Sequence, residues 1–211
     1  LTRLVGSEMC IRDRLNTTCS DIKPDSIKIG MLSDKKIIQE ISKFIDNYKI
    51  SKVVLDPVMV STSGYLLLKK SSISSLTKNL ITKSMIITPN LKEAEILTNT
   101  KINSKDDMIN AIQILEKIGA KDILIKVLIK NGKIFDCLFI KKNKKIQFFE
   151  SSIIKSKNTH GTWCTLSSAI ASNLALGEDI LNSVKKSRNY IKSAIINGSF
   201  YKIGKEIILY I

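Results

Sequence analysis

Two hydrophobic patterns alternate along the chain. Short apolar runs, typical of parallel strands buried on both faces, occur at 53–55, 85–88 and 123–126, and a strand-like alternation occurs at 27–31. Between these runs, apolar residues recur three or four positions apart. That spacing predicts helices over residues 37–48, 76–80, 91–98, 108–118, 166–176 and 180–195.

The order of these elements predicts the fold class. Strands and helices alternate as βαβαβαβ, followed by antiparallel strands at 134–140 and 146–149 and two further helices. This order is typical of an α/β fold with three layers, αβα, in which helices cover both faces of a mostly parallel sheet. Ligands of such sheets bind beyond the carboxyl ends of the strands. Asp56, Asn90, Lys126 and the turn at Gly161 all follow predicted strands, so we expect them at one edge.

The turn before residues 166–176 is the main candidate for chemistry. A β-like run at 148–157, a turn of small residues and a helix follow one another, and a helix N-terminus of this kind aims backbone N–H groups at an anion. The candidate anion hole consists of Gly161, Thr162 and Trp163. Cys164 lies in the first helical turn, where we expect the pKa of its thiol to lie below the free value of about 8.5. This combination fits phosphoryl transfer to a hydroxyl.

Two other interpretations of this turn are open. The turn residues can form an ordinary helix cap, with Cys164 as a small buried side chain. Alternatively, Cys164 can be a nucleophile paired with His160, the only histidine. The second alternative is disfavoured because the two residues are four positions apart across a turn and no other histidine can form such a pair.

Polar residues at three predicted strand ends have both a structural and a functional interpretation. Asp56 precedes a proline, as turn residues often do, or it serves as a magnesium or water ligand. Asn90 and Glu93 form a plain N-terminal helix cap, or they contribute to magnesium binding near ATP phosphates. Lys126 either reaches solvent or contacts a phosphate. Their shared position at one edge favours the functional interpretation.

Composition limits the remaining possibilities. The 211 residues suffice for one domain, and four cysteines without paired spacing indicate neither a disulfide framework nor a zinc site, which fits a reducing cytoplasm. No apolar run approaches the ~18 residues of a membrane span. The net charge of +15 comes from lysines spread over every segment, and the one cluster, at 141–145, reads as a solvated hairpin tip. We therefore expect no nucleic-acid partner and no membrane partner.

Residues 1–14 do not fit the pattern of the rest. They have no apolar signal region and no clear period, and residues 7–14 (SEMCIRDR) resemble the translation of a sequencing adapter. We expect residues 1–14 to be non-native, and residues 15–211 to form one domain that lacks its natural N-terminal part.

Several motifs together resemble the hydroxymethylpyrimidine/phosphomethylpyrimidine kinase family of thiamine biosynthesis, a branch of the ribokinase-like superfamily. The resemblance extends from about residue 22 to about residue 195, in order and with similar spacing. The motifs that carry it are KIGML at 28–32, LDPVMV at 55–60, TPNLKEAE at 88–95, DILIK at 122–126 and NTHGTWCTLSSAIA at 158–171.

The resemblance implies an ATP-dependent kinase that phosphorylates 4-amino-5-hydroxymethyl-2-methylpyrimidine and then its monophosphate, with Mg2+ as cofactor. Cys164 would assist deprotonation of the acceptor, and the amides of 161–164 would hold the transferring phosphate. The other implied roles are magnesium binding by Asp56 and Glu93, nucleotide binding by Asn90, Lys126 and Thr159, and pyrimidine binding by Met31 and Val60. A cytoplasmic enzyme, possible as a homodimer in its full-length form, is implied as well.

Three departures from the family pattern keep alternatives open. The glycine-rich strand and turn expected before Lys28 is missing, Trp163 stands where the family has glycine, and residues 127–129 (VLI) replace two glycines and a histidine, with one residue apparently lost. The alternatives are a vitamin B6 kinase of the same superfamily, in which aspartate is expected at the position of Cys164, and a degenerate pseudokinase that binds without turnover.

Overall fold

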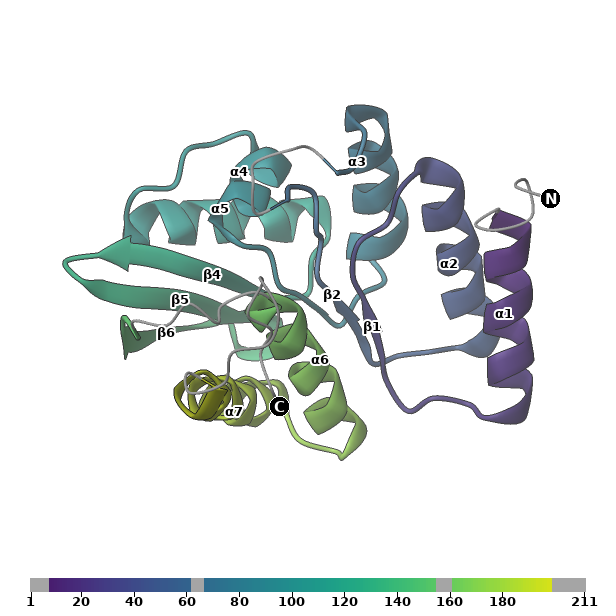
Figure 1. Ribbon diagram of the computed structural model, residues 1–211. Coiled ribbons are helices and arrows are strands. Elements are labelled where there is room, and N and C mark those ends of the chain that lie inside the picture. Colours follow the sequence, from purple (N-terminus) through teal and green to yellow (C-terminus); the bar gives the residue numbers. More distant parts are fainter. Residues whose placement is uncertain (1–7, 62–66, 155–160, 199–211) are drawn as a thin grey trace.

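A single six-stranded sheet organises the computed structural model, which describes residues 8–61, 67–154 and 161–198 (Figure 1). The strands lie in the order of the chain: β1 (Ile27–Ile29), β2 (Val53–Leu55), β3 (Ile86–Ile87), β4 (Asp122–Lys130), β5 (Lys133–Ile140) and β6 (Lys145–Ser152). The first four are parallel, and β5 and β6 are antiparallel to their neighbours. The mostly parallel sheet with an antiparallel hairpin at one side is therefore confirmed.

Helices cover both faces of the sheet, as predicted (Figure 1). They are α1 (Glu8–Asp21), α2 (Lys35–Tyr48), α3 (Lys70–Leu76), α4 (Leu91–Thr98), α5 (Lys105–Ile118), α6 (Thr162–Ala175) and α7 (Ile180–Gly198), with a π turn, η1 (Thr77–Ile81), and a 3-10 turn, η2 (Lys141–Asn143). Helices α2 to α5 share one hydrophobic cluster with Val53 and Leu55, whereas α6 and α7 share the other with Val54. Alternating residues of β2 thus contact opposite layers, which is the expected consequence of strand geometry.

Side chains cap the N-termini of several described helices. Asp34 accepts hydrogen bonds from Lys36 N and Ile37 N at the start of α2, and Ser104 accepts one from Asp107 N at the start of α5. Asp179 accepts one from Asn182 N at the start of α7. The helix predicted at 76–80 is longer than expected, since α3 begins at Lys70 and continues into the π turn η1.

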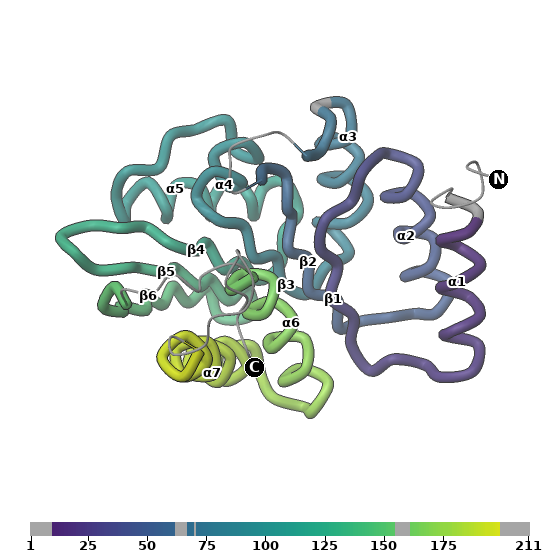
Figure 2. The backbone as a smooth tube through the Cα atoms, viewed as in Figure 1, coloured from purple at the N-terminus to yellow at the C-terminus, as the bar shows by residue number. Residues whose placement is uncertain are grey.

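Helix α1 crosses the predicted boundary at residue 14. It runs continuously from Glu8 to Asp21, and its residues Ile11, Leu15 and Cys19 pack against the larger hydrophobic cluster. Figure 2 shows α1 beside α2, on the side of the sheet away from the β5–β6 hairpin. That residues 1–14 are non-native stays a prediction.

A bulge interrupts the pairing of β4 with β5. Ile125 pairs with Cys137 and Leu128 pairs with Phe135, so two residues of β4, Lys126 and Val127, lie opposite one residue of β5. Val127 has φ +70°, a left-handed conformation that is unfavourable for a β-branched side chain. The resemblance noted in the sequence implies glycine directly after the lysine, and the backbone at Val127 has the conformation that glycine adopts freely.

Replacing Val127 with glycine should stabilise the fold. The left-handed conformation costs a non-glycine residue about 1–2 kcal/mol, and glycine removes this strain. Glycine also makes the unfolded chain more flexible, which offsets roughly 0.5–1 kcal/mol of the gain in stability. We expect Val127→Gly to raise the melting temperature by about 2 °C, measured by circular dichroism. Val127→Ala is the matched control, since it keeps a Cβ and should gain less. A lower melting temperature for Val127→Gly than for the parent would show that the bulge is not strained.

Candidate active site

A buried carboxylate, Asp56, lies where the strand ends converge. It directly follows β2, is only 1% exposed, and its backbone N–H donates to Ile29 O of β1 at 2.8 Å. Its Oδ1 accepts a hydrogen bond from Lys126 Nζ at 2.9 Å, and Thr88 Oγ1 lies 3.3 Å from the same oxygen. Since a buried charge requires a partner, the ion pair with Lys126 compensates the burial of Asp56 in this position.

Lys126 does not reach solvent. Its side chain is 1% exposed, its Nζ is bound to Asp56, and its backbone N–H donates to Pro89 O at 3.0 Å. The interpretation of Lys126 as a solvent-reaching side chain is therefore wrong. The aliphatic part of the Lys126 side chain is buried, and its ammonium lies at the strand ends beside the Asp56 carboxylate. A contact with a phosphate stays a prediction.

Ser167 ties helix α6 to this pair. Its Oγ donates to Asp56 Oδ2 at 3.0 Å, and it also lies 3.0 Å from Cys164 O, although the carboxylate is the stronger acceptor. Lys28 Nζ, from β1, lies 4.0 Å from the same Asp56 oxygen. Asp56 thus has contacts from β1, from β4, from the end of β3 and from α6, and these contacts fix the helix relative to the sheet.

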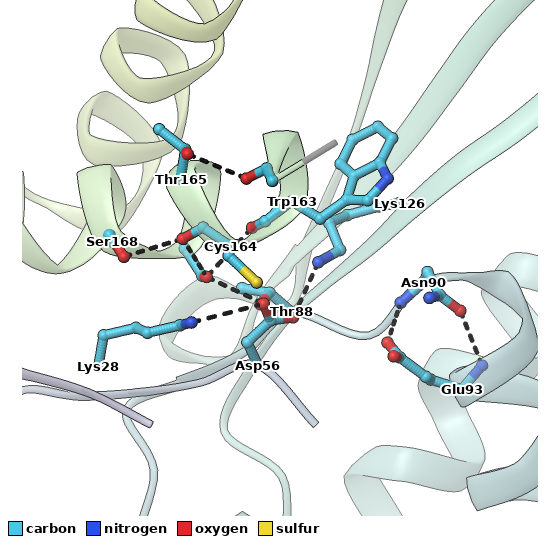
Figure 3. Close-up of polar contacts among 12 residues, drawn as sticks. Lys28, Asp56, Thr88, Asn90, Glu93, Lys126, Trp163, Cys164, Thr165 and Ser168 are labelled. Atoms are coloured by element: carbon cyan, nitrogen blue, oxygen red, sulfur yellow. Dashed lines mark hydrogen bonds and ion pairs between the residues drawn. The ribbon is translucent and has the colours of Figure 1, made fainter. Parts of the chain in front are cut away.

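The N-terminus of α6 lies directly above this cluster (Figure 3). Gly161 is the cap residue, with φ +81°, and its own side chain, a hydrogen atom, offers no cap to the helix. Because the first N–H groups of a helix have no partner within the helix, those of Trp163 and Cys164 are donors expected to meet an anion. Cys164 is the third helical residue and is exposed, and its side chain points in the direction of Asp56 (Figure 3). The alternative of Cys164 as a buried residue is wrong.

Trp163 takes a position beside the lysine. The centre of its ring lies 5.8 Å from Lys126 Nζ, and the residue is 37% exposed. The left-handed conformation of this turn falls on Gly161, whereas Trp163 lies within α6. The backbone therefore does not require a glycine at position 163, and the effect of the tryptophan is to place a large ring next to Lys126 (Figure 3).

Asn90 and Glu93 form a reciprocal capping box at the start of α4. Asn90 Oδ1 accepts from Glu93 N at 2.9 Å, and Glu93 Oε2 accepts from Asn90 N at 2.8 Å (Figure 3). Glu93 is 2% exposed, and burial raises the pKa of its carboxyl to about 7, although the hydrogen bond from Asn90 and the charge of Lys126 lower it. The structural interpretation of this pair is confirmed, and its role toward a nucleotide or magnesium stays a prediction.

The remaining predicted residues lie at the same edge of the sheet or outside the described part of the chain. Met31 follows β1 and is exposed, and Val60 follows β2 and packs against the larger hydrophobic cluster while partly exposed. Thr159 and His160 lie outside the described residues, so the structure does not test a nucleotide contact of Thr159 or a pair of His160 with Cys164.

The donor set fits magnesium only in part. In the described ranges, no group of three or more acidic, histidine or cysteine side chains could hold a metal ion. Asp56 already binds Lys126 and Ser167, and Glu93 binds Asn90 N. Hard oxygen donors in this number suit a magnesium ion that keeps most of its waters and takes its other ligands from phosphates.

Three residues of the cluster had no predicted role. Lys28, Thr88 and Ser167 all contact Asp56, but no local pattern indicates this. The available signal was indirect. Lys28 alternates with apolar neighbours in a strand, and Thr88 directly follows a second strand. Ser167 lies one helical turn after Trp163 in α6.

This geometry is suited to holding a phosphate over a buried charge pair and passing it to a hydroxyl. The class that it defines, together with the three-layer α/β fold, is that of α/β kinases acting on small molecules. None of the described helices combines the length and hydropathy needed to cross a bilayer.

Comparison with known proteins specifies the class further. The model of the phosphomethylpyrimidine kinase family matches residues 5–209. Hydroxymethylpyrimidine/phosphomethylpyrimidine kinase of Bacillus subtilis is 34% identical over 189 residues, which cover 89% of this chain and 69% of that protein. The chain therefore belongs to the phosphomethylpyrimidine kinase family, and its fold is ribokinase-like.

Two groups of solved structures resemble the chain. Phosphomethylpyrimidine kinase from Clostridium difficile 630 is 39% identical with a TM-score of 0.77, and the match covers 90% of this chain and 77% of that one. Pyridoxal kinase from Staphylococcus aureus in complex with AMP-PCP superimposes with a higher TM-score, 0.85, over 95% and 72%, but at 28% identity. Since backbones of one fold vary less than their sequences, the identity and the family match favour the pyrimidine kinase over the B6 kinase.

Replacing Glu93 with glutamine should change how stability depends on pH. A carboxyl whose pKa rises from 4.5 unfolded to about 7 folded binds its proton more tightly in the folded state, so stability is lost as pH rises through that window. Glutamine mimics the protonated form. We expect Glu93→Gln to gain stability relative to the parent from pH 5 to pH 8, by at most on the order of 3 kcal/mol, in urea denaturation.

The matched control is Glu150→Gln, which alters an exposed carboxylate on β6 and should leave the pH dependence unchanged. Parallel stability curves for the parent and Glu93→Gln would contradict the raised pKa.

Proposed function

We propose that this chain transfers the γ-phosphoryl group of ATP to the hydroxymethyl oxygen of 4-amino-5-hydroxymethyl-2-methylpyrimidine, and then a second one to the resulting monophosphate, in thiamine biosynthesis. The observation that carries the proposal is the position of the α6 N-terminus and Cys164 above the buried Asp56–Lys126 pair, in a chain of the phosphomethylpyrimidine kinase family. The Staphylococcus aureus relative with a bound ATP analogue supports ATP as the donor.

In this proposal each part of the cluster has a defined task. The N–H groups at the start of α6 stabilise the negative charge on the transferring phosphoryl group, and Cys164 takes the proton of the attacking hydroxyl. The bond between the γ-phosphorus and its bridging oxygen breaks, a bond from the hydroxymethyl oxygen to phosphorus forms, and ADP leaves. Asp56 holds Lys126 at the strand ends, so that the ammonium faces the phosphates with little loss of side-chain freedom.

The nucleotide and metal roles follow from the same edge of the sheet. Asn90 and Lys126 are neighbours through a parallel backbone bridge, and we assign both to the nucleotide phosphates, together with Thr159. Magnesium, when bound, supplies neutralisation of phosphate charge. Asp56 and Glu93 would hold it through its waters. Met31 and Val60 are assigned to the pyrimidine. The proposal also includes a cytoplasmic location and a homodimer. Light scattering measures the oligomeric state.

Phosphate transfer from labelled ATP to two acceptors tests the proposal. With magnesium present, we expect labelled pyrimidine monophosphate and diphosphate, and at least tenfold slower labelling of pyridoxal. Faster labelling of pyridoxal would make the chain a B6 kinase, the alternative that the higher TM-score of the pyridoxal kinase favours. ATP binding without labelling of either acceptor, in the parent and in Trp163→Gly alike, would make it a pseudokinase.

Replacing Cys164 with alanine should slow the transfer. A general base contributes about 10²–10⁴-fold, and the loose transition state of phosphoryl transfer needs little proton removal, so we expect kcat to fall by about 100-fold with KM for ATP nearly unchanged. Cys19→Ala, on α1, is the matched control and should keep the parent rate. Equal rates for Cys164→Ala and the parent would remove Cys164 from the mechanism.

A further inference from the structure

Helix α7 carries a partly buried arginine, Arg188, whose contacts are separate from the Asp56 cluster. The side chain of Arg188 is 14% exposed and pairs with Asp136 of β5, whose side chain is 4% exposed. Arg188 also donates to Ser151 Oγ of β6 at 2.8 Å, and its guanidinium lies 4.9 Å from the centre of the Phe149 ring. The arginine thus joins α7 to both strands of the hairpin.

The other oxygen of Asp136 acts on the bulge in β4. Asp136 Oδ1 accepts a hydrogen bond from Val127 N at 2.8 Å. Asp136 is the single β5 residue opposite both Lys126 and Val127, so the regular ladder of hydrogen bonds is interrupted at this point. The carboxylate replaces the backbone acceptor that the bulge removes, and it supports the left-handed conformation of Val127.

The supported amide belongs to the residue next to Lys126. The backbone of Lys126 is held on its other side by Pro89 O, and its Nζ reaches Asp56. The direction in which β4 leaves Lys126 therefore depends on the hydrogen bond between Val127 N and Asp136. A shift of the bulge would move the stem of the lysine, and with it the ammonium at the strand ends.

Stability alone does not explain the pair. A buried ion pair is often no more stabilising than apolar residues of similar volume, because both charges lose their hydration. Burial lowers the pKa of Arg188 to about 10, so the guanidinium stays charged at neutral pH and bears this cost. An apolar residue in place of Asp136 would remove the acceptor for Val127 N.

We infer that Asp136 and Arg188 are positioning residues for phosphoryl transfer, which orient Lys126 through the amide of Val127. This inference rests on the proposed function, and it assigns to the β5–α7 side of the sheet a role in setting the geometry of the nucleotide site. Arg188 orients the carboxylate, and the carboxylate fixes the bulge.

Two double variants separate positioning from simple packing. Asp136→Leu with Arg188→Met removes both charges and the acceptor, whereas Asp136→Asn with Arg188→Met removes both charges and keeps an acceptor oxygen. We expect both to melt within about 3 °C of the parent. In the leucine variant kcat/KM for ATP should fall about tenfold, with less than a threefold change in the asparagine variant.

Trp163 provides a readout that does not depend on turnover. It is the only tryptophan, and its ring lies beside Lys126 Nζ. Its fluorescence emission should therefore change in the leucine variant in the same direction as in Lys126→Met, and should stay close to the parent in the asparagine variant.

The outcomes are distinct. Unchanged ATP kinetics and unchanged emission in the leucine variant, or equal losses in both double variants, would overturn the inference. If the parent transfers no phosphate, the proposed function fails, and the emission spectra alone still decide on positioning. If the leucine variant does not fold, Arg188→Lys takes its place: a two- to fourfold fall in kcat/KM or a shift of Trp163 emission supports positioning, and neither change refutes it.

Discussion

The buried ion pair between Asp56 and Lys126 is the interaction on which the arrangement of the site depends. The 2.9 Å contact joins the end of β2 to β4 across the intervening β3, and Ser167 connects the same carboxylate to α6. Removing either charge would leave the other buried without its nearest charged partner, which costs far more free energy than the pair itself contributes to stability. The fold therefore keeps both charges at the strand ends, directly beneath the helix N-terminus where a phosphate is expected.

A second ion pair lies beside the first, on the neighbouring strand β5 and on α7. Asp136 and Arg188 support the bulge that follows Lys126, so the lysine is constrained through its ammonium and through its backbone. The left-handed conformation of Val127 is the cost of this arrangement. Glu93, held by its capping box beside Lys126, adds a carboxyl whose charge depends on pH near neutrality. The site is thus a set of coupled buried charges, and it is not assembled from flexible surface groups.

Much of this could be predicted from the sequence, because the signals were local. Periodicity marked the strands and most helix limits. The common edge of Asp56, Asn90 and Lys126 followed from strand order. The pairing of Lys126 with Asp56 and the contacts of Lys28, Thr88 and Ser167 did not, since they depend on register between segments far apart in the chain. The sequence at 127–129 indicated that one residue had been lost after Lys126. The structure shows a bulge at Lys126 and Val127, and the carboxylate that supports it, Asp136, comes from the next strand.

The most direct test is a double-mutant cycle on the central pair. The free energy of unfolding in urea would be measured for the parent, Asp56→Asn, Lys126→Met and the double variant. The account predicts that Lys126→Met alone lowers the free energy of unfolding by about 3–5 kcal/mol, because it leaves a buried carboxylate without its nearest cation. The double variant should recover at least about 2 kcal/mol of the summed losses. Losses that add to within about 0.5 kcal/mol would show that the two charges do not depend on each other, and would contradict the account.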